Sequence, residues 1–184
     1  MFVYLKPSPV VEDVLGTLKR IGCPTLAYVD GLPAAARGRL ESPTLRIAPN
    51  RLDVGTVSRE CDLAVVNGGH GVVAEMLLAG KPVLAIPLNL EQQQTARALE
   101  HLGAGQAASV REPYAVVPRL QGMVGGDAAE QCARGARRFA ERYSCFDRGR
   151  QRLAMFERAE ELLAMGDREP QAGHVEPAAE LPAG

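Results

Sequence analysis

The chain has 184 residues, of which 46% are hydrophobic and 23% are charged. This is enough for one domain with a substantial core and too little for two large domains. A formal net charge of −1 gives no electrostatic attraction to DNA or to anionic lipid. The apolar runs are far shorter than the roughly 20 residues that a membrane-spanning helix needs, and no signal peptide is recognisable. We therefore expect a cytoplasmic protein without a membrane span.

Strands and helices alternate along the first two thirds of the chain. A strand is expected at residues 2–5, followed by a helix with Ser8 as N-cap, Pro9 as its first residue and Gly22 at its end. This helix carries apolar residues at helical spacing, namely Val11, Val14, Leu15 and Leu18. Further strands are expected at residues 25–29, 44–48, 63–66 and 83–86. The alternation predicts an α/β fold, a Rossmann-like doubly wound parallel sheet.

The last third of the chain is expected to be helical and then disordered. One helix is predicted at residues 114–124, and one or two long helices at residues 127–165. The apolar anchors expected on the long helices are Phe139, Tyr143, Phe146, Leu153 and Phe156. Arginine and glutamate interleave along them, so nucleic-acid binding is not expected. We predict a folded domain at residues 1–165 and a disordered tail at residues 166–184, which is rich in Pro, Ala, Gly and Glu.

A glycine turn, Asn67-Gly68-Gly69-His70-Gly71, follows the strand at 63–66 and opens a helix expected at 72–79. Without side chains, the backbone N–H groups can approach a ligand closely, and the helix directs its positive end there. This pattern favours a bound phosphate group. The alternative is a tight turn that only allows close packing of strand and helix.

Two polar side chains, Glu91 and Gln92, follow the next strand at the start of another helix. Ligands of open α/β sheets bind outside the carboxyl ends of the strands, so this pair and the glycine turn can face one crevice. A carboxylate beside an amide suits sugar hydroxyls. The alternative for Glu91 is stabilisation of the first helical turn.

The spacing of these residues resembles the donor-binding motif of the GT-B glycosyltransferases, specifically family 1 enzymes similar to UDP-glycosyltransferases. In that family a position opening a glycine turn is followed by a glutamate eight residues later and by an Asp/Glu-Gln pair after sixteen more. Those positions are Asn67, Glu75 and Glu91-Gln92 in this sequence. Residues 48–50 resemble the upstream loop that holds the base, with Asn50 in place of the usual Gln. The resemblance implies the C-terminal, donor-binding half of the GT-B fold.

The resemblance also implies a role for each matching residue. Glu75 would bind the ribose hydroxyls, Glu91 and Gln92 the transferred sugar, and the backbone of 68–71 the diphosphate. The donor-binding residues implied are Asn50, Asn67, Gly68, Gly69, His70, Gly71, Glu75, Glu91 and Gln92. The donor would be a UDP- or dTDP-sugar, bound as a substrate and without any cofactor.

Three positions depart from the family pattern. Asn67 stands where the family has an imidazole against phosphate, Val72 where it has Ser or Thr, and Ile47 where it has a Trp that stacks on the base. Asn67 and Val72 therefore weaken two expected phosphate contacts, and Ile47 leaves less aromatic surface for the base. His70 is a candidate to supply a ring N–H or a charge instead, and the alternative is that it faces solvent.

The function expected from the resemblance is transfer of a hexose from a nucleotide diphosphate sugar to a small-molecule acceptor. GT-B enzymes carry their general base in the other half, so no catalytic residue is assigned, and a separate acceptor-domain subunit is a possible partner. The alternative is a truncated or degenerate, non-catalytic nucleotide-sugar-binding module. A nucleotide-sugar epimerase is less favoured, because the Glu-Gln pair resembles transferases. No metal is expected, since Cys23, Cys61, Cys132 and Cys145 lack ligand spacing.

Overall fold

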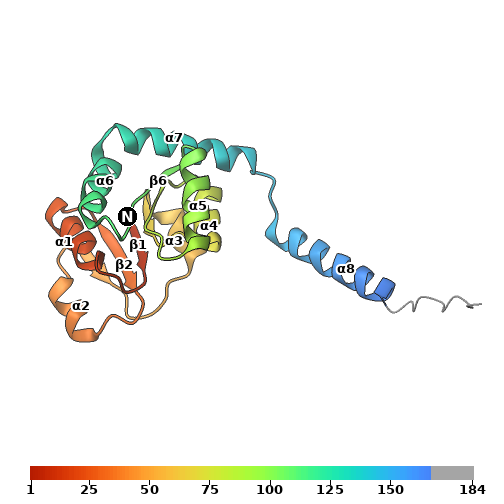
Figure 1. Ribbon diagram of the computed structural model, residues 1–184, viewed down its shortest axis with the longest axis horizontal. Helices are drawn as coiled ribbons and strands as arrows, with labels where there is room; N and C mark the ends of the chain where they lie inside the picture. Colours follow the sequence, from red (N-terminus) through yellow and green to blue (C-terminus); the bar gives the residue numbers. More distant parts are fainter. Residues whose placement is uncertain (167–184) are drawn as a thin grey trace, which may run out of the picture. The chain divides into compact units, whose positions relative to one another are not determined.

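The computed structural model describes residues 1–166, in which six strands alternate with helices up to α6 and two further helices follow (Figure 1). The strands are β1 (Phe2–Leu5), β2 (Thr25–Val29), β3 (Leu45–Ile47), β4 (Ala64–Val66), β5 (Val83–Ala85) and β6 (Gly105–Ala107). The helices are α1 (Val11–Ile21), α2 (Ala34–Leu40), α3 (Val54–Glu60), α4 (His70–Leu78), α5 (Leu90–His101), α6 (Pro113–Gly125), α7 (Asp127–Arg142) and α8 (Arg148–Gly166).

All six strands pair in parallel, in the order β3-β2-β1-β4-β5-β6. The order reverses between β1 and β4, so their carboxyl ends form the topological switch point of the sheet. The predicted Rossmann-like α/β fold is confirmed. Strand β6 was not expected from the sequence, because three residues beginning with glycine carry no strand signal.

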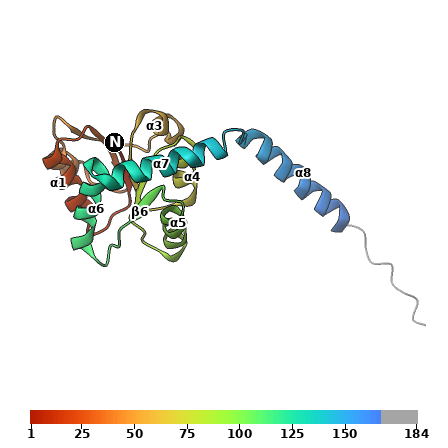
Figure 2. The same ribbon diagram turned by 90° about the horizontal axis from the view of Figure 1, so that it is seen from above.

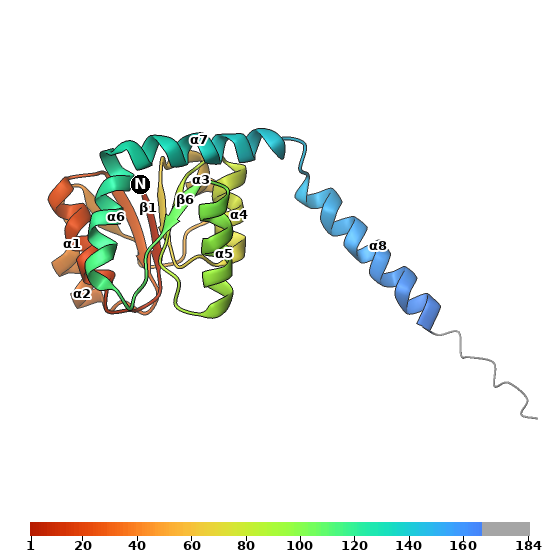
Figure 3. The same ribbon diagram turned by 45° about the horizontal axis from the view of Figure 1, so that its top comes forward.

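Helices cover both faces of the sheet, and consecutive strand residues alternate between two cores (Figure 3). Val3 and Leu5 of β1 face the core formed with α1 and α6, whereas Phe2 faces the core formed with α3, α4, α5 and α7. The same alternation sends Val65 to the first core and Ala64 to the second. Burial on both faces explains why the strands read as continuous apolar runs.

Helix α7 runs across one end of the sheet (Figure 2). Its Cys132 packs against Leu63, which precedes β4, and its Gly135 lies against the turn at Gly103 that precedes β6. Gly80, which precedes β5, also lies close to α7 at Ala140. These contacts are all at the amino ends of strands. The carboxyl ends, where Rossmann-like sheets bind ligands, lie at the opposite edge.

The boundaries of some helices differ from the sequence-based prediction. Helix α1 begins at Val11, with the fully buried Val10 as its N-cap, so Ser8 is not the cap. Within the described residues the Ser8 hydroxyl has no hydrogen-bond partner. Burial of Val10 fixes the start of the helix more strongly than a side-chain cap would. Helix α4 begins at His70, two residues earlier than expected, which places the last part of the glycine turn inside the helix.

The long helical region expected at residues 127–165 is two helices, α7 and α8. Of its expected anchors, Phe139 packs partly buried against the second core. The expectation was wrong for the other four, whose side chains are exposed: Tyr143, Phe146, Leu153 and Phe156.

Contacts divide the chain at Ser144, and α8 belongs to the second unit. The disordered tail predicted at 166–184 lies outside the described residues, except for Gly166, the last residue of α8. In residues 1–166, no helix combines the length and the apolar character that crossing a membrane requires.

Candidate functional site

The glycine turn lies between β4 and α4, and its glycines are present for different physical reasons. Gly68 has φ of +83°, and an added Cβ would lie 3.2 Å from the backbone oxygen of Gln92. Gly68 is therefore required by the fold itself. Gly69 and Gly71 have negative φ, and a Cβ on either would meet nothing within 4 Å. Neither backbone conformation nor internal packing requires glycine at these two positions, which leaves open space in front of the turn.

The start of helix α4 faces this open space. Gly69 is the N-cap and has no side chain with which to cap the helix. The first N–H groups of a helix have no acceptor within the helix, so those of His70, Gly71 and Val72 are available to a ligand. Together with the helix dipole they favour an anion at this position.

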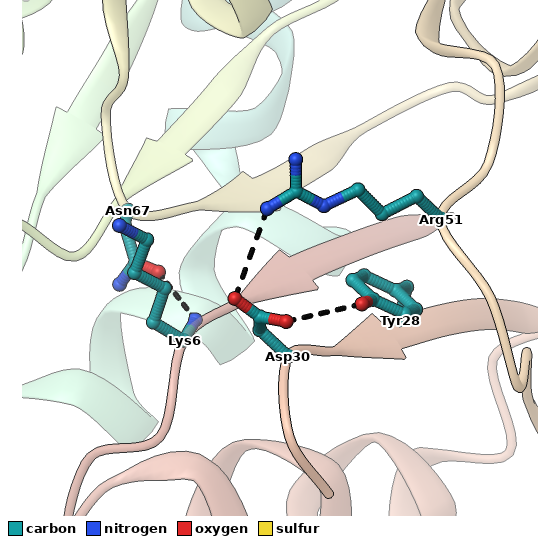
Figure 4. Close-up of polar contacts among 5 residues, drawn as sticks. All are labelled: Lys6, Tyr28, Asp30, Arg51 and Asn67. Carbon is teal, nitrogen blue, oxygen red and sulfur yellow. Dashed lines mark hydrogen bonds and ion pairs between the residues drawn. The ribbon is translucent and has the colours of Figure 1, made fainter.

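Asn67, the first residue of the turn, is buried and connects three strands (Figure 4). Its Oδ1 accepts a hydrogen bond of 2.6 Å from the Lys6 backbone N–H, just after β1. Its Nδ2 donates a bond of 2.8 Å to the Ile86 carbonyl, just after β5. The amide therefore ties the carboxyl ends of β1 and β5 to that of β4.

Replacing Asn67 with alanine is expected to lower the free energy of unfolding by about 2 kcal/mol, because a buried N–H and a buried carbonyl lose their partners. Asn50→Ala is the matched control, since Asn50 is exposed, and should change stability by less than about 0.5 kcal/mol. Urea denaturation of both variants measures the difference. Equal stabilities would show that the Asn67 amide does not hold the strand ends together.

A cavity of about 270 Å³ lies in front of the turn. Its walls come from the carboxyl ends of β1 and β4 and from the first turns of α4 and α5. They are Tyr4, Lys6, Val66, Asn67, Gly69, His70, Gly71, Val72 and Gln92. The structure thus brings together five of the predicted donor-binding residues: Asn67, Gly69, His70, Gly71 and Gln92.

Gln92 and Glu91 are placed differently, although they are adjacent in the sequence. Gln92 is buried, and its Oε1 accepts a hydrogen bond of 2.8 Å from the Leu88 N–H, which fixes the side chain at the cavity wall. Its backbone N–H donates to Oδ1 of Asn89, the N-cap of α5, a cap not foreseen from the sequence. Glu91 lies exposed in the first helical turn and is not part of the cavity wall in the described chain.

A second cavity, of about 250 Å³, adjoins the first and shares Tyr4 and Val72 with it. The rings of Tyr4 and Tyr28 lie 5.6 Å apart, and the Arg51 guanidinium lies 6.0 Å from the centre of the Tyr4 ring. Asp30 accepts a 3.1 Å hydrogen bond from the Tyr28 hydroxyl and lies 3.8 Å from Arg51 (Figure 4). This cavity is lined by three aromatic rings, those of Phe2, Tyr4 and Tyr28.

Two other predicted residues lie near these cavities without lining them. Glu75, on α4, is half-buried and turns toward the start of α3, where its Oε1 lies 3.6 Å from the position of a Cβ on Gly55. Asn50 is exposed in the loop after β3. Among the described residues neither contributes to the wall of either cavity.

Sequence reasoning missed Tyr4, Lys6 and Arg51 as parts of the site. Tyr4 and Lys6 belong to the carboxyl end of β1, which the strand order places directly beside β4. The signal that could have found Tyr4 and Lys6 is the rule that crossing connections bring the first strand of such a sheet to its switch point.

Another cavity, of about 400 Å³, lies elsewhere, beside the edge strand β6. Glu100 accepts a hydrogen bond of 3.0 Å from the Ala107 N–H, Arg119 donates to the Ala107 carbonyl, and the two side chains lie 3.7 Å apart. Glu100 and Arg119 thus provide hydrogen-bond partners for the backbone N–H and carbonyl of Ala107, which would otherwise be unpaired at the edge of the sheet. Covering a sheet edge explains this charged pair without a ligand, so we favour the cavity at the switch point.

In residues 1–166, no three His, Cys, Asp or Glu side chains are grouped so that they could hold a metal ion. Burial raises the pKa of the Cys61 and Cys132 thiols, which keeps them protonated at neutral pH. A protonated thiol is neither a good nucleophile nor a metal ligand.

Known proteins similar to this chain are glycosyltransferases. No family model matches it. Over 85 residues, 46% of the chain, it is 32% identical to the zeaxanthin glucosyltransferase of Pseudescherichia vulneris. Over 76% of this chain, the structure is similar to that of Phytolacca americana UGT2 complexed with UDP-2fluoro-glucose and pterostilbene, with a TM-score of 0.61 and 18% identity. The fold of this chain is that of one Rossmann-like domain of the GT-B glycosyltransferases.

A second GT-B structure gives the same result. The Streptomyces sp. SF2575 glycosyltransferase SsfS6, complexed with thymidine diphosphate, matches over 79% of this chain with a TM-score of 0.58 and 20% identity. The chain covers 36% of the Phytolacca americana structure and 37% of SsfS6, and the aligned segment is 21% of the zeaxanthin glucosyltransferase. It therefore spans a minor part of each GT-B relative.

Proposed function

We propose that the chain is the donor-binding half of a glycosyltransferase, which transfers a hexose from a UDP- or dTDP-sugar to a small-molecule acceptor together with an acceptor domain. The observation that carries this proposal is the cavity at the switch point. It combines an uncapped helix start, two glycines that the fold does not require, and an adjoining aromatic cavity.

The diphosphate of the donor is assigned to the start of α4. Its oxygens would accept hydrogen bonds from the backbone N–H groups near Gly71, where the open space admits them without a clash. Stabilising the leaving diphosphate in this way is also the main catalytic contribution expected from this half of the enzyme. No catalytic base is assigned within the chain.

The nucleoside is assigned to the second cavity, which shares Tyr4 and Val72 with the cavity that contains the phosphate position. Tyr4 and Arg51 present flat surfaces there, and a base could stack on either. Support comes from the relatives, one of which is described with UDP-2fluoro-glucose and another with thymidine diphosphate.

The transferred sugar is assigned to the start of α5. The Gln92 amide already lines the cavity, and its Nε2 is suited to donate to a sugar hydroxyl. Glu91 lies one residue earlier in the same helical turn, exposed, where its carboxylate could accept hydroxyl hydrogen bonds from a sugar that extends out of the cavity.

One observation favours the alternative of a non-catalytic nucleotide-sugar-binding module. Both polar atoms of the Asn67 side chain already bond to the backbone, so its amide is committed to joining strands where the family places a phosphate-binding imidazole. This alternative shares the binding site with the enzyme. Transfer activity, measured after an acceptor domain is supplied, separates the two.

Calorimetric titration of the purified chain with UDP, dTDP and their glucose conjugates tests the proposal. Saturable binding with one ligand per chain is expected for at least one of the four. A chain that unfolds cooperatively on heating, and so is folded, yet binds none of them would contradict the proposed donor site.

Glu91→Ala is expected to weaken binding of the glucose conjugate by about tenfold, since one or two hydrogen bonds to a charged group are lost. Binding of the free nucleoside diphosphate should stay nearly unchanged. Glu112→Ala is a matched control, because Glu112 is also exposed and lies outside the switch-point cavity. Equal weakening of both ligands by Glu91→Ala would contradict a sugar-binding role.

A further inference from the structure

We propose that Lys6 is the cation that neutralises the donor diphosphate, a role that the sequence pattern does not assign. The inference rests on the proposed function of the switch-point cavity, and it adds a residue to that site. Lys6 immediately follows β1, the strand that pairs with β4, and it lines the cavity together with Gly69 and Gly71.

Among the residues that line the switch-point cavity, Lys6 is the main source of positive charge for a bound anion. The lining residues include no aspartate or glutamate, and Lys6 is the one lysine or arginine among them. The helix start provides only about half an elementary charge. A nucleoside diphosphate carries more negative charge than this, so a nearby ammonium group would strengthen its binding considerably.

The Lys6 side chain is available for this task. It is exposed, and within the described residues it takes part in no ion pair. Its backbone N–H donates a 2.6 Å hydrogen bond to Asn67 Oδ1, which anchors the residue at the cavity wall without using the ammonium group (Figure 4). Asn67 thus contributes through position: its amide places a lysine beside the phosphate site rather than contacting phosphate itself.

The sequence offers a natural comparison, because it contains three lysines, Lys6, Lys19 and Lys81. Lys19 lies on α1, where its Nζ donates a 3.3 Å hydrogen bond to the Glu41 carbonyl, and it is not among the residues lining the cavity. Lys19→Gln therefore makes the same change in net charge away from the proposed site.

The test measures UDP and dTDP binding to wild type, Lys6→Gln, Lys6→Arg and Lys19→Gln by calorimetry at low and high salt, with thermal melting of each. Lys6→Gln is expected to weaken binding by about tenfold at low salt and to flatten its salt dependence, because one charged contact is lost. Lys6→Arg should stay within about threefold of wild type, Lys19→Gln should match it, and all four melting temperatures should agree.

The outcomes separate this inference from the function on which it rests. Wild-type binding together with an unchanged affinity or salt dependence in Lys6→Gln would overturn the role of Lys6 and leave the donor site standing. Weaker binding accompanied by a clearly lower melting temperature in both Lys6→Gln and Lys6→Arg would also overturn it. The loss of affinity would then come from a destabilised structure and not from the loss of the positive charge. A folded wild type that binds no UDP or dTDP would remove the proposed function and this inference together.

Discussion

Replacing Gly71 with glutamate is expected to weaken UDP binding on the order of a hundredfold without lowering the stability of the chain. The new side chain would occupy the open space in front of α4, where a Cβ meets nothing within 4 Å, and would place a carboxylate at the proposed diphosphate position. The same carboxylate lies in the first turn of a helix, which favours negative charge and prefers glutamate to glycine. The free energy of unfolding should therefore stay equal or rise by up to about 1 kcal/mol.

Gly38→Glu is the control for this experiment. Gly38 lies on helix α2, and an added Cβ there also meets nothing within 4 Å, so charge and bulk change equally at a site away from the cavity. Calorimetry should show that Gly38→Glu binds UDP as tightly as the wild type does. Urea denaturation gives the free energy of unfolding of both variants. If Gly71→Glu also binds UDP normally, the diphosphate does not lie at the start of α4.

Replacing Gly135 with alanine is expected to lower the free energy of unfolding by about 3 kcal/mol. An added Cβ would lie 2.0 Å from the Gly103 carbonyl oxygen and 2.9 Å from the Ala104 nitrogen, and both are backbone atoms that cannot rotate away. Helix α7 would have to shift from the amino end of the sheet. In an unconstrained helix the same change would be stabilising by about 1 kcal/mol, so the expected sign is opposite to helix propensity.

Gly122→Ala provides the matched comparison. Gly122 also lies inside a helix, α6, and an added Cβ would meet nothing within 4 Å. This variant should be as stable as the wild type or slightly more stable in urea denaturation. Gly135→Ala with wild-type stability would show that α7 is not packed as closely against the turn before β6 as the structure describes.

Much of the fold could be predicted from the sequence because its strands are buried on both faces. Runs such as residues 63–66 and 83–86 are apolar without alternation, and the predicted strands there match β4 and β5 closely. Strand β6 was missed because its first residue, Gly105, carries no side chain. Glycine is needed there because a Cβ would lie 2.1 Å from the Val83 carbonyl oxygen of the neighbouring strand. Strand prediction relies on the pattern of side chains along the sequence. Strand β6 instead depends on a close approach between two backbones, which such a pattern does not show.

The candidate site was predictable where it depends on one segment and not where it depends on strand order. The turn from Asn67 to Gly71 lies in one stretch of sequence, and the structure places it at the cavity. Tyr4 and Lys6 reach the same cavity only because β1 pairs with β4, about sixty residues away, a pairing that no local pattern reveals. The Asn67 side chain also could not be interpreted from sequence, since its partners at Lys6 and Ile86 come from two other strand ends.

The central claim is that a nucleoside diphosphate binds at the switch point of the sheet, and an NMR titration of the isotope-labelled chain with UDP tests it most directly. The amide signals of Lys6, Gly69, His70 and Gly71 should shift together and saturate. Signals of residues beside the edge strand β6, such as Arg97 and Arg111, should not follow the same curve. Saturable shifts confined to the cavity beside β6, or no saturable shift in the glycine turn, would contradict the account.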